Sequence, residues 1–187
     1  MSFYEPLASK YRPRTLDEFV GQEHLVGENG PIRKFLESGD IPSMIFWGPP
    51  GTGKTTLAYI LSLNLYYDFH RVQAVSSGKE TLRRIIKIAT DNRQYGKKTI
   101  LFLDEIHRWN KAQQDALLPY VENGTIILIG ATTENPSFSI ISALLSRTKV
   151  FVFKQQTEDD IYNLLKRISS KEFPDIQISE KVFRHMA

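Results

Sequence analysis

Eight consecutive residues give the sequence its clearest chemical signal. They are Gly48, Pro49, Pro50, Gly51, Thr52, Gly53, Lys54 and Thr55, and they match the pattern G-x-x-x-x-G-K-[ST] at every fixed position. Glycines let such a loop curl so that backbone N–H groups point at phosphate oxygens, and a following helix adds its positive amino-terminal end. Lys54 supplies a positive charge for the β- and γ-phosphates, and Thr55 supplies a hydroxyl for Mg²⁺. Thr56, the next residue, is also predicted to bind the nucleotide. We therefore predict a triphosphate-binding loop, since the alternative, a purely structural turn, leaves the lysine without a role.

Two adjacent carboxylates, Asp104 and Glu105, follow the apolar run from Ile100 to Leu103. Such a run predicts a buried strand, and open α/β sheets bind ligands beyond the carboxyl ends of their strands. Asp104 is predicted to orient Mg²⁺, partly through water, because this ion keeps much of its hydration shell. Glu105 is predicted to polarise the water that attacks the γ-phosphate. A helix cap or a solvated turn is the ordinary alternative for paired acids, and the lysine loop favours the catalytic interpretation.

Strand and helix signals alternate along the first 155 residues, and these elements must position the loop and the acids. Apolar runs predict strands over residues 43–47, 71–75, 99–103, 125–129 and 149–153. Helical periodicity and capping residues predict helices over residues 31–38, 55–67, 79–94, 110–122 and 139–146. Pro119 should kink or shorten the helix that contains it. Apolar strands separated by helices are typical of a parallel sheet with helices on both faces, which places the chain in the α/β class.

After Phe153 the pattern becomes wholly helical. Thr157 begins a helix with capping chemistry, and Ser179 begins another that runs to Ala187 without a stop signal. We therefore divide the chain into an α/β nucleotide-binding domain, residues 1–155, and the beginning of a helical lid, residues 156–187. The missing stop signal leads us to expect that more of the helical domain follows in a longer protein.

The composition of the 187 residues excludes several classes of protein. A hydrophobic fraction of 41% and a charged fraction of 24% are globular values. The absence of cysteine excludes a disulfide scaffold, a thiolate zinc site and a cysteine nucleophile. The net charge of +3 permits a nucleic-acid partner without requiring one. Apolar runs stay far below the ~20 residues of a membrane span and no signal peptide is recognisable, so we expect a soluble cytoplasmic protein with no membrane partner.

Four segments together resemble AAA+ ATPases of the clamp-loader and RuvB branch. They are residues 48–55, Leu103-Asp104-Glu105-Ile106-His107, the run from Gly130 to Pro136, and Leu145-Ser146-Arg147. The segments Leu7–Pro13 and Phe19–Leu25, with Glu134–Phe138, more closely resemble the RarA/MgsA family of replication-associated recombination ATPases, relatives of the Werner-helicase-interacting protein. The resemblance implies ATP and Mg²⁺ as cofactors and a P-loop AAA+ fold: a five-stranded parallel sheet followed by an all-helical lid.

The resemblance also assigns residues that bind the base. In such ATPases two segments near the amino terminus wrap the adenine. The matching positions of this sequence are Tyr11, Arg12 and Pro13 in one segment and Val20 and Gly21 in the other.

Three further roles come from the resemblance. Thr133 corresponds to the polar sensor that touches the γ-phosphate or the water, with Thr132 and Asn135 as neighbouring alternatives. Arg147 resembles the arginine finger, which acts in trans on the nucleotide of the neighbouring subunit, and a surface arginine at a helix end is its ordinary alternative. Ser76, after the second predicted strand, is a candidate restraint on Glu105, although turn chemistry also explains a serine there.

Basic residues gather between Lys79 and Lys98. Lys79, Arg83 and Lys87 share one face of the predicted helix and could follow a phosphate backbone, although a solvated face is the ordinary alternative. The resemblance implies action on single-stranded or forked DNA or on DNA ends, homo-oligomers of the full-length protein, and association with the nucleoid. It also suggests a single-stranded-DNA-binding protein as a partner.

The leading hypothesis is therefore Mg-dependent ATP hydrolysis in DNA replication, recombination and repair, at stalled forks or DNA ends. A clamp-loader-like or RuvB-like subunit and an ATP switch with little hydrolysis are the alternatives. A DExH helicase core would need a second sheet domain, for which 187 residues leave no room. The lid arginine that senses nucleotide in this family and its carboxyl-terminal assembly region have no counterpart here. We therefore expect these residues alone to bind nucleotide weakly and to turn it over slowly.

Overall fold

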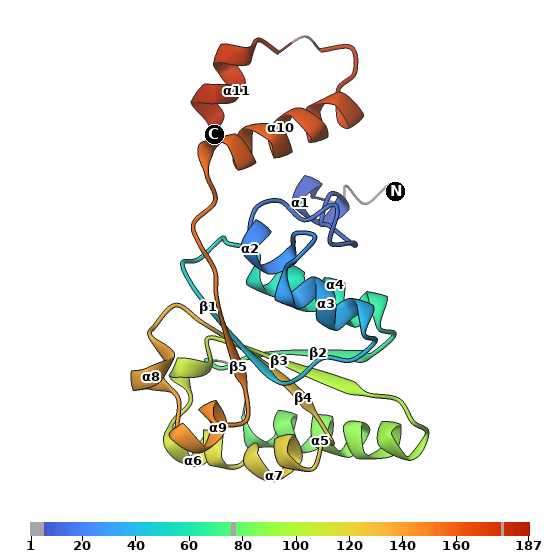
Figure 1. The fold of residues 1–187 in the computed structure, drawn as a ribbon, viewed down its shortest axis with the longest axis vertical. Helices are drawn as coiled ribbons and strands as arrows, with labels where there is room; N and C mark the ends of the chain where they lie inside the picture. Colours follow the sequence, from blue (N-terminus) through green and yellow to red (C-terminus); the bar gives the residue numbers. More distant parts are fainter. Residues whose placement is uncertain (1–5, 76–77, 177) are drawn as a thin grey trace.

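The computed structural model of the chain describes residues 6–75, 78–176 and 178–187. In this part of the chain, five parallel strands form one sheet in the order β2-β3-β4-β1-β5 (Figure 1). The strands are β1 (Met44–Trp47), β2 (Asp68–Gln73), β3 (Thr99–Asp104), β4 (Ile127–Thr132) and β5 (Lys149–Val152). The α/β class and the five-stranded parallel sheet expected from the sequence are confirmed.

The interior strands of the sheet bring the predicted motifs together at the carboxyl ends of the strands, which we call the carboxyl edge of the sheet. β1, β3 and β4 have neighbours on both sides and helices over both faces, which explains why their sequences are continuous apolar runs. All strands are parallel, so Trp47, Asp104 and Thr132, the last residues of these three strands, lie at the same edge. The phosphate loop begins directly after Trp47 and therefore starts at that edge.

Helices cover both faces of the sheet and enclose a separate apolar core on each (Figure 1). α3 (Pro31–Glu37) and α4 (Lys54–Asn64) contribute Ile32, Leu57 and Leu61 to one core. α5 (Lys79–Gln94) contributes Leu82 and Ile85 to the other. The remaining elements of the α/β part are the 3₁₀ helix η1 (Ile106–Arg108), α1 (Leu7–Lys10), α2 (Glu23–Val26), α6 (Lys111–Asp115), α7 (Leu118–Glu122), α8 (Pro136–Ser139) and α9 (Ser142–Leu145).

Two strands occupy other residues than the sequence predicts. β2 covers residues 68–73 and not 71–75, because Asp68 to Gln73 pair in register with Thr99 to Asp104. β4 covers residues 127–132 and not 125–129, because it continues beside β1 as far as Thr132. Glycine at position 130 allows the strand to pass here, because a Cβ on Gly130 would lie 2.9 Å from the side chains of both Ile45 and Ile106. The pairing of neighbouring strands, which local patterns do not contain, fixes both boundaries.

Three predicted helices differ from those observed. The helix predicted over residues 55–67 is α4, which ends at Asn64 because Tyr66, at φ +56°, turns the chain into β2. The helix predicted over residues 139–146 is wrong as one element: α8 and α9 are separated by Ile140, which is extended at φ −118°. The helix predicted over residues 110–122 is divided into α6 and α7, with Pro119 in the first turn of α7, as its ring requires.

The chain ends in two helices that lie beyond the amino-terminal segment, away from the sheet (Figure 1). α10 (Glu158–Glu172) begins with a capping box in which the side chains of Thr157 and Asp160 bond each other's backbone N–H groups. α11 (Glu180–Met186) packs on α10 through an edge-to-face contact of Tyr162 and Phe183. Within the described ranges, no helix has the length and apolar character needed to cross a lipid bilayer.

Candidate functional site

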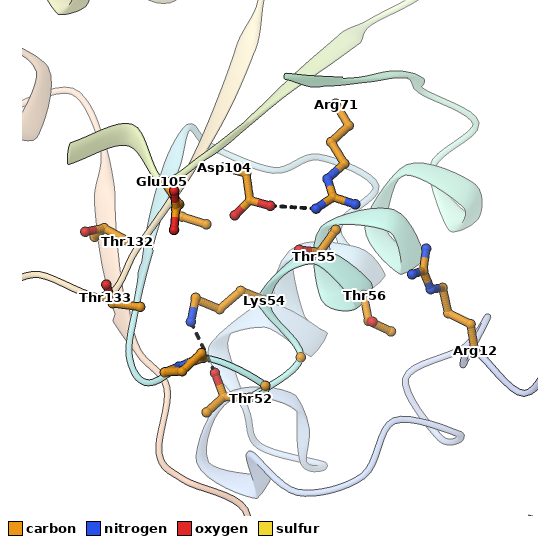
Figure 2. A pocket seen from close by; sticks show the side chains of 14 residues that line it. Arg12, Thr52, Lys54, Thr55, Thr56, Arg71, Asp104, Glu105, Thr132 and Thr133 are labelled. Atoms are coloured by element: carbon orange, nitrogen blue, oxygen red, sulfur yellow. Dashed lines mark hydrogen bonds and ion pairs between the residues drawn. The ribbon is translucent and has the colours of Figure 1, made fainter. Parts of the chain in front are cut away.

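A cavity of about 400 Å³ opens at the carboxyl edge of the sheet and collects most of the predicted residues (Figure 2). Its lining consists of Arg12, Pro50, Gly51, Thr52, Gly53, Lys54, Thr55, Thr56, Arg71, Asp104, Glu105, Ala131, Thr132 and Thr133. These residues come from the amino-terminal segment, the phosphate loop with α4, strand β2, and the ends of β3 and β4. Gly48 and Pro49 do not line the cavity, but their carbonyl oxygens hold the lysine that does.

The loop between β1 and α4 needs its glycines for space and for conformation. Gly53 has φ +92°, and a Cβ there would lie 2.6 Å from the ring of Phe19. A Cβ on Gly48 would lie 2.3 Å from the carbonyl oxygen of Phe153. Both contacts are too short for any side chain, so the loop can pass between these residues only as glycine. Its curled backbone ends at Lys54, the first residue of α4, so the amino-terminal end of that helix faces the cavity.

The ammonium of Lys54 lies inside the curl of the loop. Its Nζ donates hydrogen bonds to the carbonyl oxygens of Gly48 at 2.7 Å and Pro49 at 2.6 Å. Burial lowers the pKa of Lys54, and the charge of Asp104 opposes that shift. The positive charge of Lys54 therefore lies in a partly dehydrated site, where its attraction to an anion is stronger than in bulk water.

The two acids differ in their surroundings although they are adjacent. Asp104 ends β3 and accepts a hydrogen bond at 2.7 Å from Nη2 of Arg71, on the neighbouring strand β2. Glu105 is exposed and has the left-handed backbone conformation φ +54°, ψ +46°. This conformation is unfavourable for a residue with a Cβ, and such strain is concentrated at functional sites. It turns the chain out of β3 at the cavity, whose lining includes Glu105 (Figure 2).

Three polar residues after β4 were candidates for the sensor, and their hydrogen bonds differ. The Thr132 hydroxyl lies 3.0 Å from Nδ1 of His107 and also bonds both backbone groups of Glu134. The Asn135 side chain accepts from the Ser137 N–H and caps α8. Thr133 is exposed, lines the cavity and has no hydrogen-bond partner among the described residues. Its hydroxyl is therefore the one in this group available to a ligand.

A second cavity of about 370 Å³ adjoins the first, because Arg12, Gly51, Gly53 and Thr56 line both. Four of the five residues predicted to wrap the adenine line it, namely Tyr11, Arg12, Pro13 and Val20. Its far wall is formed by Leu164 and Ile168 of α10. Gly21 lies outside the lining, at φ +73° beside the Asp160 carboxylate. The apolar walls and the shared border with the phosphate cavity suit a flat base joined to a triphosphate.

Gln22 was not a predicted site residue, yet it secures this second cavity. Its buried side chain donates to the Lys154 carbonyl oxygen at 2.6 Å and accepts from the Lys154 N–H at 2.9 Å. Nε2 of His24 lies 2.9 Å from the Val152 carbonyl oxygen. These bonds attach the amino-terminal segment to the end of β5 and to the chain that follows it. A glutamine two residues after Val20 gives no local signal for a contact 132 residues away.

Arg147 does not contribute to the cavity of its own chain. It precedes β5 and so lies at the amino edge of the parallel sheet, opposite the phosphate loop. Its guanidinium forms an ion pair with Glu122 at 2.6 Å and donates to the Ala143 carbonyl oxygen at 2.7 Å. Ser76, the predicted restraint on Glu105, lies outside the described residues. Arg71 reaches the cavity although no sequence motif includes it.

The residues that line the first cavity fit Mg²⁺ and a nucleoside triphosphate. The Thr55 hydroxyl and the Asp104 carboxylate are hard oxygen donors in one cavity, as Mg²⁺ requires. Residues 6–75, 78–176 and 178–187 contain no group of three His, Cys, Asp or Glu side chains that could hold a metal ion. An ion here would therefore keep water and phosphate oxygens among its ligands, which is the usual arrangement for Mg²⁺ with nucleotides.

Residues 44–156 match the model of the family described as "ATPase family associated with various cellular activities (AAA)". The chain belongs to the AAA family of ATPases. This AAA chain is also similar to solved structures. To the Thermotoga maritima RuvB Holliday junction branch migration motor it has a TM-score of 0.75 and 30% sequence identity, covering 93% of this chain and 58% of that one.

Curated relatives confirm the resemblance to the RarA family. Replication-associated recombination protein A of Haemophilus influenzae is 53% identical over 164 residues, which is 88% of this AAA chain and 37% of that protein. The ATPase WRNIP1 of Dictyostelium discoideum is 49% identical over 164 residues, 88% of this chain and 19% of that protein. The chain thus spans well under half the length of these relatives.

Proposed function

We propose that this AAA domain binds Mg–ATP and hydrolyses it in a protein that acts in DNA replication, recombination or repair. One observation carries the enzymatic part: Lys54, Thr55, Asp104, Glu105 and Thr133 come from three separate segments and line the same cavity. The similarity to RarA and to the RuvB motor supports the part that concerns DNA. We further propose that residues 156–187 begin a helical lid over the base.

Each side chain has a role that follows from its place. Lys54 exchanges the carbonyl oxygens of Gly48 and Pro49 for phosphate oxygens, beside the N–H groups of the loop. Thr55 and Asp104 hold Mg²⁺, which when bound neutralises charge on the β- and γ-phosphates. Glu105 orients the attacking water and accepts its proton, and Thr133 donates a hydrogen bond to the γ-phosphate or the water.

Two substitutions separate binding from hydrolysis. Lys54→Ala should weaken Mg–ATP binding at least tenfold in calorimetry, because the loop loses its cation. Glu105→Gln should bind Mg–ATP within threefold of the unchanged protein and lose at least about 100-fold in turnover, because the amide cannot accept the proton. Lys34→Ala, on an exposed position of α3, is the control. Unchanged ATP affinity in Lys54→Ala contradicts the proposal, and full turnover in Glu105→Gln favours a different base.

We propose that the exposed face of α5 contacts DNA. Arg83, Arg84 and Lys87 lie together on the surface of this helix, with Glu80 as the acid among them. The side chain of Lys79, also predicted for this stripe, lies outside what the structure describes. Three cations on one helical face suit the regular spacing of backbone phosphates. A single-stranded-DNA-binding protein stays a predicted partner.

Charge reversal tests the DNA surface. The double change Arg83→Glu with Lys87→Glu should weaken binding to single-stranded and forked DNA at least tenfold at moderate salt and reduce its salt dependence. The pair Lys34→Glu with Lys181→Glu makes the same change in net charge on exposed residues of α3 and α11. Equal losses for the two pairs would show that only net charge matters, and α5 would then not be the contact surface.

A further inference from the structure

One cation of the phosphate cavity has no part in the function proposed above. Arg71 lies on the edge strand β2, and its guanidinium lines the cavity beside Lys54, Thr55 and Asp104 (Figure 2). It bonds Asp104, the carboxylate expected to hold the metal, at 2.7 Å. The side chains are 42% and 23% exposed, so the pair is partly shielded from water. A cation paired with the carboxylate that is expected to hold Mg²⁺ must affect how that site binds its ligands.

The sheet register shows that this pair is built into the fold. Gln73, and not Arg71, lies directly beside Asp104, whereas Arg71 lies beside Phe102. Residues two apart on a strand share a face, so Arg71 and Asp104 project to the same side of the sheet and meet along a diagonal. A long, forked guanidinium spans that offset, and the aromatic rings of Phe69 and Phe102 lie on the same face behind it. The side-chain lengths and the register together direct the charge to Asp104.

We propose that Arg71 is the resident counter-ion of Asp104, which it neutralises in the metal-free site and releases when a divalent cation takes the carboxylate. The inference rests on the proposed nucleotide function. A bare Asp104 would repel a triphosphate that arrives without metal, since both are anions in a partly shielded cavity. With Arg71 in place that repulsion is removed. Only one Arg71 nitrogen bonds Asp104 in the structure, and guanidinium has five N–H donors in all, so others can contact a phosphate.

The proposal predicts that Arg71 controls how strongly nucleotide binding depends on metal. In Arg71→Gln, calorimetry should show ATP affinity in excess EDTA reduced about tenfold or more, and affinity in excess Mg²⁺ reduced less than threefold. Arg71→Lys keeps the charge and should restore most of the metal-free affinity. The matched control Lys34→Gln, which removes an exposed cation from α3, should leave both affinities unchanged. Thermal unfolding of each variant shows whether it is folded.

A double-mutant cycle separates a counter-ion from a simple phosphate contact. When Asp104→Asn removes the negative charge, Arg71→Gln should cost less than threefold in metal-free ATP affinity, because no carboxylate remains to be neutralised. An equal loss with Asp104 and with Asn at this position would overturn the proposal, as would equal losses with and without Mg²⁺. If the unchanged protein binds no ATP in Mg²⁺, the nucleotide function itself fails. If it binds ATP normally but shows neither pattern, only the role of Arg71 fails.

Discussion

At the scale of single residues, the site combines strain with charge. Glu105 retains a left-handed backbone that favours glycine, so the fold tolerates an unfavourable conformation where the carboxylate lies at the cavity. Lys54 donates to two backbone carbonyl oxygens and Asp104 is paired with Arg71, so both of these charges have partners before any ligand arrives. These features belong to binding and chemistry, and the apolar cores on the two faces of the sheet supply the stability that permits them.

Asp68 shows how a single carboxylate should make stability depend on pH. Burial acts to raise its pKa, but hydrogen bonds from Asn92 at 2.7 Å and His70 at 3.0 Å outweigh it, so the net pKa is lowered. A lowered pKa in the folded state gives stability that is present above the ordinary pKa and lost as pH falls through the folded value. Asp68→Asn should therefore lower the unfolding free energy by about 1 kcal/mol at neutral pH.

Urea unfolding from neutral to acidic pH tests this prediction. The difference between Asp68→Asn and the unchanged protein should shrink toward zero as the solution becomes acidic enough to protonate Asp68. Asp91→Asn, an exposed carboxyl on α5, should show no such dependence. A difference that stays constant over the whole range would mean that the Asp68 charge contributes nothing.

At the scale of elements, the segment around Gln22 is bonded to the stretch of chain that leads from β5 into α10. Gln22→Ala leaves both backbone groups of Lys154 without their partners and should destabilise the protein by about 2 kcal/mol. It should also weaken ATP binding, because the second cavity lies between this segment and α10. Chemical unfolding and calorimetry measure the two effects, with Gln94→Ala at the exposed end of α5 as the control. A stability loss with unchanged ATP affinity would separate Gln22 from the base site.

At the scale of the whole molecule, Arg147 is separated from the phosphate cavity of its own chain. It lies at the edge of the sheet opposite the phosphate loop and is paired with Glu122, so within one chain it cannot reach the cavity. An arginine finger at this position would have to act on a neighbouring copy. A protein that binds ATP in one chain and hydrolyses it only when assembled would behave as a switch when alone, which is the alternative function left open by the sequence.

Mixing two inactive variants tests whether Arg147 acts across an interface. Arg147→Ala and Glu105→Gln should each lose at least about 100-fold in turnover. An equal mixture of the two should regain a substantial part, because some interfaces then combine an intact Glu105 with an intact Arg147 from the adjacent copy. Each variant mixed with itself is the control. No recovery in assemblies that contain both variants would contradict action in trans.

The sequence alone determined the features that depend on neighbours along the chain. The loop from Gly48 to Thr55 is contiguous, and Asp104 and Glu105 follow a strand whose apolar run is unmistakable. The capping chemistry at Thr157 and the bounds of α5 are likewise local and were predicted correctly. Hydrogen bonds between residues three or four apart, and periodic burial, depend only on short stretches of sequence, so they can be predicted without knowledge of the fold.

The tertiary structure alone decided whatever depends on contacts between distant segments. The bounds of β2 and β4 follow from strand register, and the bond of Gln22 to Lys154 joins residues 132 apart. Arg71 meets Asp104 only because parallel pairing places β2 beside β3, with Asp104 two residues beyond Phe102, the register partner of Arg71. No sequence motif includes these pairs, since a side chain finds its charge partner across strands only after the sheet has aligned them.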